Sequence, residues 1–122
     1  MNSKEIATRD TYLYVNTYLA EYTENAGKAV EKLHNQYMEL NQFCRNNSCI
    51  PNKTSYDVIE DEALDSKEEL KEVLDDIALG KVECLVVYRK SMLVSNCSKE
   101  AYEMLEYMIN QHDCKLLILH DN

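Results

Sequence analysis

The feature that most constrains the fold is a regular alternation between strand-like and helix-like apolar patterns. Strand-like runs are short and rich in β-branched, aromatic or continuously apolar residues. Four such runs occur, at 12–19 (YLYVNTYL), 56–60 (YDVIE), 84–88 (CLVVY) and 116–119 (LLIL). Between them, apolar residues recur every three or four positions, as on a helix with one buried face. These helical stripes span 26–44, 70–77 and 101–109.

Strands that alternate with helices of this length predict a doubly wound α/β domain with a mainly parallel, four-stranded sheet. The strand order expected for this pattern is 2-1-3-4. Helices should cover both faces, because the continuously apolar third and fourth runs need cover on each side. Asp65 or Ser66 is expected to cap the second helix and Gly80 to end it. The chain is expected to form one domain over 12–122, preceded by an N-terminal tail at 1–11.

The charge balance restricts the classes of partner. Acidic residues outnumber basic ones by 22 to 13, which gives a formal net charge of -9. Nucleic-acid binding draws most of its affinity from Lys and Arg side chains that release phosphate counterions. We therefore expect no autonomous DNA binding. The densest acidic run, at 60–76, is typical of a solvated helix face.

The cysteines indicate reduced thiols in a cytoplasmic protein, because the five of them are odd in number and include no C-x-x-C pair. Cys44 and Cys49 are close in sequence, but no second pair matches them as a zinc site would require, so no metal is expected. No stretch approaches the ~20 apolar residues of a membrane span. We therefore expect neither secretion nor membrane insertion.

The loops at the carboxyl ends of the strands are where doubly wound domains bind ligands. A nucleotide phosphate loop would need a glycine at Tyr22 and a hydroxyl at Ala29. Thr23, Asn25 and Gly27 leave a flavodoxin-like phosphate loop as an open alternative. No residue pattern identifies a flavin sandwich, and the leading expectation is that no cofactor is bound.

The run at 86–96 (VVYRKSMLVSN) resembles the strand-to-loop signature VVYKLDRLSRN of serine site-specific recombinases, the resolvase and invertase family. Weaker matches follow the family's order and spacing, at 14–18 (YVNTY), Gln36, 40–44 (LNQFC), 59–62 (IEDE) and 67–80. Together they cover the chain from about Tyr12 to His120. The resemblance implies the fold of the family's N-terminal catalytic domain.

The resemblance also implies a reaction in which a serine hydroxyl attacks a DNA phosphodiester while arginines stabilise the developing charge. The positions that correspond to those residues are degenerate here: Tyr18 stands at the serine, Asn16 and Lys67 at two arginines, and Ser91, Met92 and Ser95 at the aspartate and two arginines of the signature. An ammonium at Lys67 does not replace a bidentate guanidinium. A one-residue slip that used Thr17, or a nucleophilic Tyr18, would not restore the arginines. Catalysis by the family's mechanism is therefore not expected.

The leading hypothesis is a catalytically inactive resolvase-like domain that acts through protein contacts, as a regulator of DNA recombination or of a mobile element. Its partner would be another protein or a second copy. The candidate partner surface combines Arg89 and Lys90 with an apolar patch of Met92, Leu93 and Val94. The alternatives are a strand-exchange recombinase or accessory subunit with a diverged active site, and a flavodoxin-like binding protein.

Overall fold

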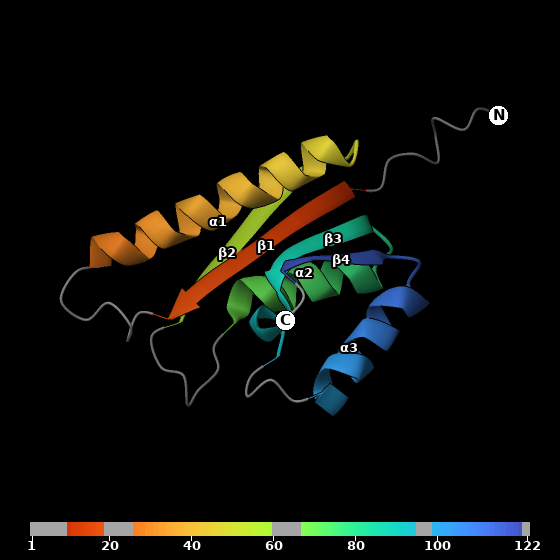
Figure 1. The fold of residues 1–122 in the computed structure, drawn as a ribbon. Coiled ribbons are helices and arrows are strands. Elements are labelled where there is room, and N and C mark those ends of the chain that lie inside the picture. The colour runs from red at the N-terminus through yellow and green to blue at the C-terminus, as the bar shows by residue number, and fades with distance from the viewer. Residues whose placement is uncertain (1–9, 19–25, 60–66, 95–98, 121–122) are drawn as a thin grey trace.

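Strands and helices alternate along the chain in the computed structural model, which describes residues 10–18, 26–59, 67–94 and 99–120 (Figure 1). The strands are β1 (Asp10–Tyr18), β2 (Lys53–Ile59), β3 (Val82–Arg89) and β4 (Lys115–His120). The helices are α1 (Ala26–Asn46), α2 (Glu68–Ala78) and α3 (Lys99–Gln111), with a short 3-10 helix, η3 (Lys90–Met92), after β3. None of the helices in the described part is long and apolar enough to cross a membrane.

The four strands form one parallel sheet in the order β2-β1-β3-β4, so the predicted topology is confirmed. β1 and β3 occupy the centre, and β2 and β4 are its edges. β1 begins at Asp10, inside the expected tail, because the amide of Asp10 donates to the carbonyl of Lys81 at 2.9 Å. The remainder of that tail, 1–9, lies outside the described residues. β2 begins at Lys53, three residues before the run that predicted it.

The helices cover both faces of the sheet, as predicted: α1 lies on one face, and α2 and α3 lie on the other (Figure 1). The two faces follow from the alternation of side chains along β1. Leu13 and Val15 pack into the core beneath α1, whereas Tyr12 and Tyr14 pack into the core with α2 and α3.

The two continuously apolar strands, β3 and β4, differ in how far their side chains are buried. In β3, Leu85 and Val87 face α2 and α3 while Cys84 and Val86 face α1, and all four side chains are buried. In β4, every residue from Leu116 to Leu119 remains partly exposed. The predicted cover on each face is therefore confirmed: Leu116 and Ile118 of β4 pack against the core with α2 and α3, and Leu117 and Leu119 pack against the core beneath α1. β4 stays partly exposed because it is an edge strand with a neighbouring strand on one side only.

The ends of α2 are set by two different devices. Gly80 ends the helix as predicted: it has a φ of +77°, and the amides of Gly80 and Lys81 bond back to the carbonyls of Ile77 and Asp76 at 3.0 Å. At the start, Lys67 occupies the capping position and makes no side-chain cap. The expected caps, Asp65 and Ser66, lie outside the described residues.

Candidate functional site

A buried polar network lies at the junction of β1, β2 and α2. The Tyr14 hydroxyl donates to Oδ2 of Asp57 at 2.6 Å. The Asn16 amide donates to the Tyr14 oxygen at 3.2 Å and to the Met92 carbonyl at 3.0 Å. All three side chains are at most 7% exposed. Tyr14 and Asn16 point to the same side of the sheet because they are two residues apart on β1.

Asp57 joins this network to the N-terminus of α2. Its Oδ1 accepts the Glu69 amide at 3.0 Å, and its Oδ2 accepts the Leu70 amide at 3.1 Å. The first amides of a helix have no partner within the helix, and the positive end of the helix dipole favours a carboxylate there. A residue of β2 therefore caps α2. Burial of the charge is tolerated because three donors surround it.

The sequence did not identify Asp57 as a site residue, although a signal exists. Ser55, Asp57 and Ile59 alternate with exposed residues along β2, so all three point into the core. A charged residue that shares the inward positions of an alternating strand must find donors. Its donors come from β1 and α2, and no local pattern names them.

Two of the degenerate positions, Asn16 and Met92, are joined by the hydrogen bond from the Asn16 amide to the Met92 carbonyl. Lys67 is 4% exposed and directly precedes α2. Ser91 is half-buried in η3. Tyr18 ends β1, but its side chain is not described, and Ser95 lies outside the described residues.

Thr17 lies on the other face of β1 from this network. It shares its side of the strand with Leu13 and Val15, which pack beneath α1. Its side chain is 2% exposed, and its hydroxyl has no hydrogen-bond partner among the described residues. A slip that placed Thr17 at the serine position would have to turn β1 over.

The prediction of an exposed apolar patch at Met92, Leu93 and Val94 is wrong. Met92 is 7% exposed and Leu93 is 5% exposed, and both belong to the core with Tyr102 of α3. Val94 packs against the same core. The reason is the 3-10 turn, closed by the Leu93 amide on the Lys90 carbonyl at 3.0 Å, which follows β3 and directs these side chains under α3.

The two cations of that predicted surface remain partly exposed and lie against aromatic rings. Lys90 Nζ is 5.0 Å from the centre of the Tyr102 ring, and the Arg89 guanidinium is 5.2 Å from the centre of the Tyr88 ring. Both distances are within the range of cation–π contacts, which attract a cation to the face of an aromatic ring. The charged part of the predicted surface is therefore accessible, and its apolar part is not.

A second cluster joins α1 to the carboxyl ends of β3 and β4. The Tyr88 hydroxyl donates to Oε2 of Glu39 at 2.7 Å, and Nε2 of His120 lies 3.3 Å from Oε1 of the same carboxylate. The Tyr88 and His120 rings meet edge to face, with centres 4.6 Å apart. The hydrogen bond from Tyr88 lowers the pKa of Glu39 and raises that of Tyr88. His120 is the last residue of β4, and the sequence analysis did not identify its contact with α1.

The remaining predictions concern bound groups. Gly27 lies exposed in the first turn of α1, while Thr23 and Asn25 fall outside the described residues. Across the described residues, no three His, Cys, Asp or Glu side chains gather as a metal site would require.

Comparison with known proteins identifies the fold. Neither a protein-family model nor a curated protein matches the sequence. Among solved structures, a serine recombinase from Sulfolobus solfataricus matches with a TM-score of 0.71 and 18% identity, over 93% of this chain and 70% of that one. The C-terminal catalytic domain of an IS607-like serine recombinase, ISC1926 TnpA, gives 0.72 and 12%, over 92% and 71%.

A third match extends the agreement to a bacterial protein. A resolvase family site-specific recombinase from Streptococcus pneumoniae matches with a TM-score of 0.66 and 16% identity, over 91% of this chain and 72% of that one. The fold implied by the motifs at 86–96 and 14–18 is thereby confirmed. The chain has the serine recombinase, or resolvase, fold.

Proposed function

We propose that this chain is a catalytically inactive resolvase-like domain that acts through protein contacts in the regulation of DNA recombination or of a mobile element. The observation that carries the proposal is that, where the resemblance implies an active site, side-chain hydrogen-bond donors bond to other groups of the protein. Both N–H groups of the Asn16 amide are engaged, by the Tyr14 oxygen and the Met92 carbonyl. The Tyr14 hydroxyl donates to Asp57.

Transfer of a phosphodiester requires donors and cations directed at the phosphate oxygens, where they stabilise the charge of the transition state. Loss of one such donor typically costs ~2.7–4 kcal/mol. In this chain an amide stands at the implied strand arginine, and its neighbour is the carboxylate of Asp57, which would repel a phosphate. These features favour a catalytically inactive site.

The test is incubation of the purified protein with supercoiled plasmid DNA, followed by denaturation in SDS. We expect neither nicked DNA nor a covalent protein–DNA adduct, because the implied nucleophile and arginines are replaced. Tyr18 stands at the position of the family's serine and carries a hydroxyl, so the control variant is Tyr18→Phe. An adduct that disappears in Tyr18→Phe, or in Thr17→Ala, would refute inactivity and favour the diverged recombinase.

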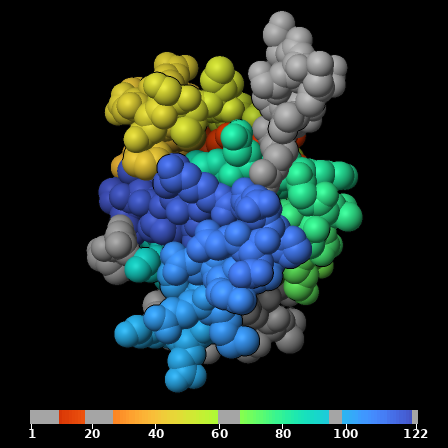
Figure 2. Space-filling model, turned by 90° about the vertical axis from the view of Figure 1, so that its right-hand side faces the viewer, coloured from red at the N-terminus to blue at the C-terminus, as the bar shows by residue number. Residues whose placement is uncertain are grey.

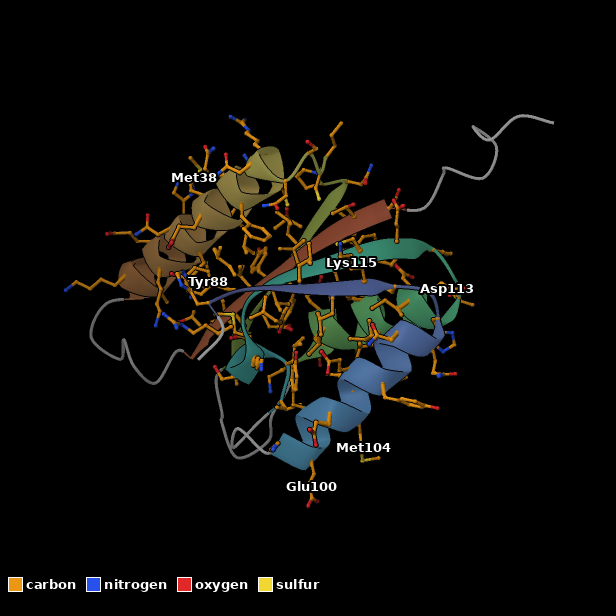
Figure 3. The ribbon with its side chains drawn as sticks, turned by 45° about the vertical axis from the view of Figure 1, so that its right-hand side comes forward. Met38, Tyr88, Glu100, Met104, Asp113 and Lys115 are labelled. Atoms are coloured by element: carbon orange, nitrogen blue, oxygen red, sulfur yellow. The ribbon has the colours of Figure 1, made fainter. Side chains whose placement is uncertain are left out.

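The surface best suited to protein contacts is the one formed by α3 and β4, which we call the α3–β4 face (Figure 2). Met104 is 74% exposed and Tyr107 is 67% exposed on α3, beside the partly exposed apolar run of β4. Figure 3 shows Met104 on the opposite side of the molecule from the exposed Met38 of α1. An apolar edge strand without internal charges pairs readily with another strand.

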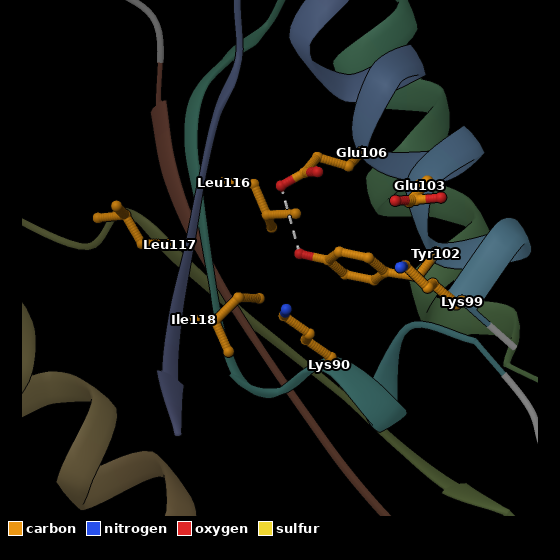
Figure 4. A pocket seen from close by; sticks show the side chains of 8 residues that line it. All are labelled: Lys90, Lys99, Tyr102, Glu103, Glu106, Leu116, Leu117 and Ile118. Carbon is orange, nitrogen blue, oxygen red and sulfur yellow. Dashed lines mark hydrogen bonds between the residues drawn. The ribbon is translucent and has the colours of Figure 1, made fainter. Parts of the chain in front are cut away.

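A hollow of about 360 Å³ lies between α3 and β4, and its charges favour a second copy as the partner (Figure 4). Lys90 lies beside Ile118 at one end, and Glu106 lies beside Leu116 at the other. If two copies pair their β4 strands about a twofold axis perpendicular to the sheet, the strands run antiparallel. Lys90 of each copy then approaches Glu106 of the other.

Light scattering coupled to gel filtration tests this contact through charge reversal. Lys90→Glu and Glu106→Lys should each shift the protein towards monomer, and the double variant should recover the dimer because the pair is restored with the opposite sign. Glu31→Lys, at an exposed position of α1, is the control for net charge. A monomeric wild type, or a double variant weaker than both single variants, would exclude this arrangement.

A further inference from the structure

The end of α1 brings two cysteines together. The Cys49 amide donates to the Cys44 carbonyl at 2.8 Å, the Ser48 amide bonds back to Arg45 at 3.3 Å, and Ser48 adopts a φ of +58°. This is the Schellman motif, in which the residue after the left-handed one donates its amide to a carbonyl in the last turn of the helix. The amide is that of Cys49, and the carbonyl is that of Cys44.

The backbone bond also limits how far apart the two residues can be. With standard bond lengths, a hydrogen bond of 2.8 Å between the Cys49 amide and the Cys44 carbonyl keeps their Cα atoms within about 7 Å. Disulfides join residues whose Cα atoms are roughly 4.4–6.8 Å apart. Cys84 lies in the same apolar cluster, but among the described residues no backbone hydrogen bond ties it to Cys44 or Cys49.

The two side chains face the same apolar cluster but differ in access to solvent. Cys44 is fully buried with Leu40, and Cys49 packs against that cluster while it remains half-buried. Burial and the nearby Cys49 raise the pKa of the Cys44 thiol. The Cys49 sulfur is therefore the more accessible of the two to a solute, and Cys44 lies buried in the cluster against which Cys49 packs.

We propose that Cys44 and Cys49 form a redox-reactive thiol pair that a hydroperoxide converts to an intramolecular disulfide. The Cys49 thiolate attacks one peroxide oxygen, so that an S–O bond forms, the O–O bond breaks, and the leaving hydroxide becomes water. The Cys44 sulfur then attacks the Cys49 sulfur, the S–S bond forms, and the S–O bond breaks with loss of a second water. The two thiols lose two electrons, and the peroxide gains them.

The disulfide would link α1 to the segment that leads into β2. That segment is already tied to β1, since the Asn52 amide donates to the Thr11 carbonyl and the Asn52 side chain accepts the Thr11 amide, both at 2.8 Å. Oxidation would therefore fix the connection between α1 and an edge strand of the sheet.

The sequence allows a direct readout, because trypsin places each of the five cysteines in a different peptide. The protein is treated with hydrogen peroxide, blocked with iodoacetamide and digested without reductant. We expect the peptides 33–45 and 46–53 to appear joined, and the joined species to be lost after dithiothreitol. Cys49→Ser should abolish it, and Cys114→Ala should retain it.

A further variant tests the order of the two steps. In Cys44→Ala the reaction should stop at a Cys49 sulfenic acid, which dimedone traps, whereas the wild type should give the joined peptides instead. Peroxide treatment that joins Cys49 to Cys84, joins two chains, or leaves Cys44 and Cys49 as free thiols would overturn the proposal.

Discussion

Asp57 is the residue on which the polar network depends, because each other member bonds to its carboxylate directly or through Tyr14. Its oxygens accept three hydrogen bonds from three donors, the Tyr14 hydroxyl and the amides of Glu69 and Leu70. Hydrogen bonds to a charged acceptor are stronger than those between neutral groups. The negative charge at this point stabilises the start of α2.

Asp57→Asn should therefore lower the free energy of unfolding by ~1–3 kcal/mol, because an NH₂ group replaces an oxygen that accepts an N–H or O–H and leaves a buried donor without a partner. Urea denaturation followed by circular dichroism measures this. The matched control is Asp75→Asn, at an exposed position of α2, which should change stability by less than about 0.5 kcal/mol. Equal effects of the two variants would contradict the role given to Asp57.

A hydrogen bond joins the start of β1 to the end of α2. The Tyr12 hydroxyl donates to Oδ2 of Asp76 at 2.7 Å. Burial, followed by this bond, raises the pKa of Tyr12 from 10.0 to about 12. The unfolded chain thus releases the phenol proton at lower pH than the folded protein, so stability is lost as the pH rises from 10 towards 12 and is intact below 10.

Tyr12→Phe removes that titration, so its stability relative to the wild type should be constant below pH 10 and should improve between pH 10 and 12. Urea midpoints across this range measure the difference, and Tyr56→Phe, at an exposed position of β2, provides the control. A difference between Tyr12→Phe and the wild type that stays flat up to pH 12 would rule out the linkage.

The elements were predictable from the sequence to the extent that one side of each is apolar. The apolar stripe at 26–44 predicted a helix and lies within α1. The continuously apolar run at 84–88 predicted a strand and lies within β3. The first residues of β2, Lys53 and Thr54, are exposed and carry no such pattern. Met92 and Leu93 were misjudged because a turn of η3, formed after the strand, decides where they point.

The site was less predictable than the fold for a physical reason. Tyr14, Asn16 and Asp57 come from two strands, and their donors and acceptors include the backbone of α2 and of Met92. Register between parallel strands sets these contacts, and no short motif encodes it. The motif at 86–96 therefore indicated the fold correctly, while the network at the carboxyl end of β1 had to be observed.

The net charge of the chain bears on whether it binds DNA. The fold is shared with proteins named as recombinases, yet a fold does not by itself carry a function. The formal charge of -9 opposes approach to a polyanion. We therefore expect the net charge to disfavour binding of this domain to a DNA duplex.

This balance predicts the outcome of a DNA titration. Fluorescence anisotropy with a labelled duplex should show no saturable binding near physiological salt, because few phosphate contacts could offset repulsion by the acidic surface. A protein that neutralises phosphates loses affinity as salt rises, with a log–log slope of about -0.9 for each contact. A saturable signal with a slope of that kind would show that a local basic patch overcomes the net charge, and would favour the accessory DNA-binding subunit. Repetition with Lys90→Glu would then show whether the α3–β4 face supplies that patch, since this variant would remove one such contact.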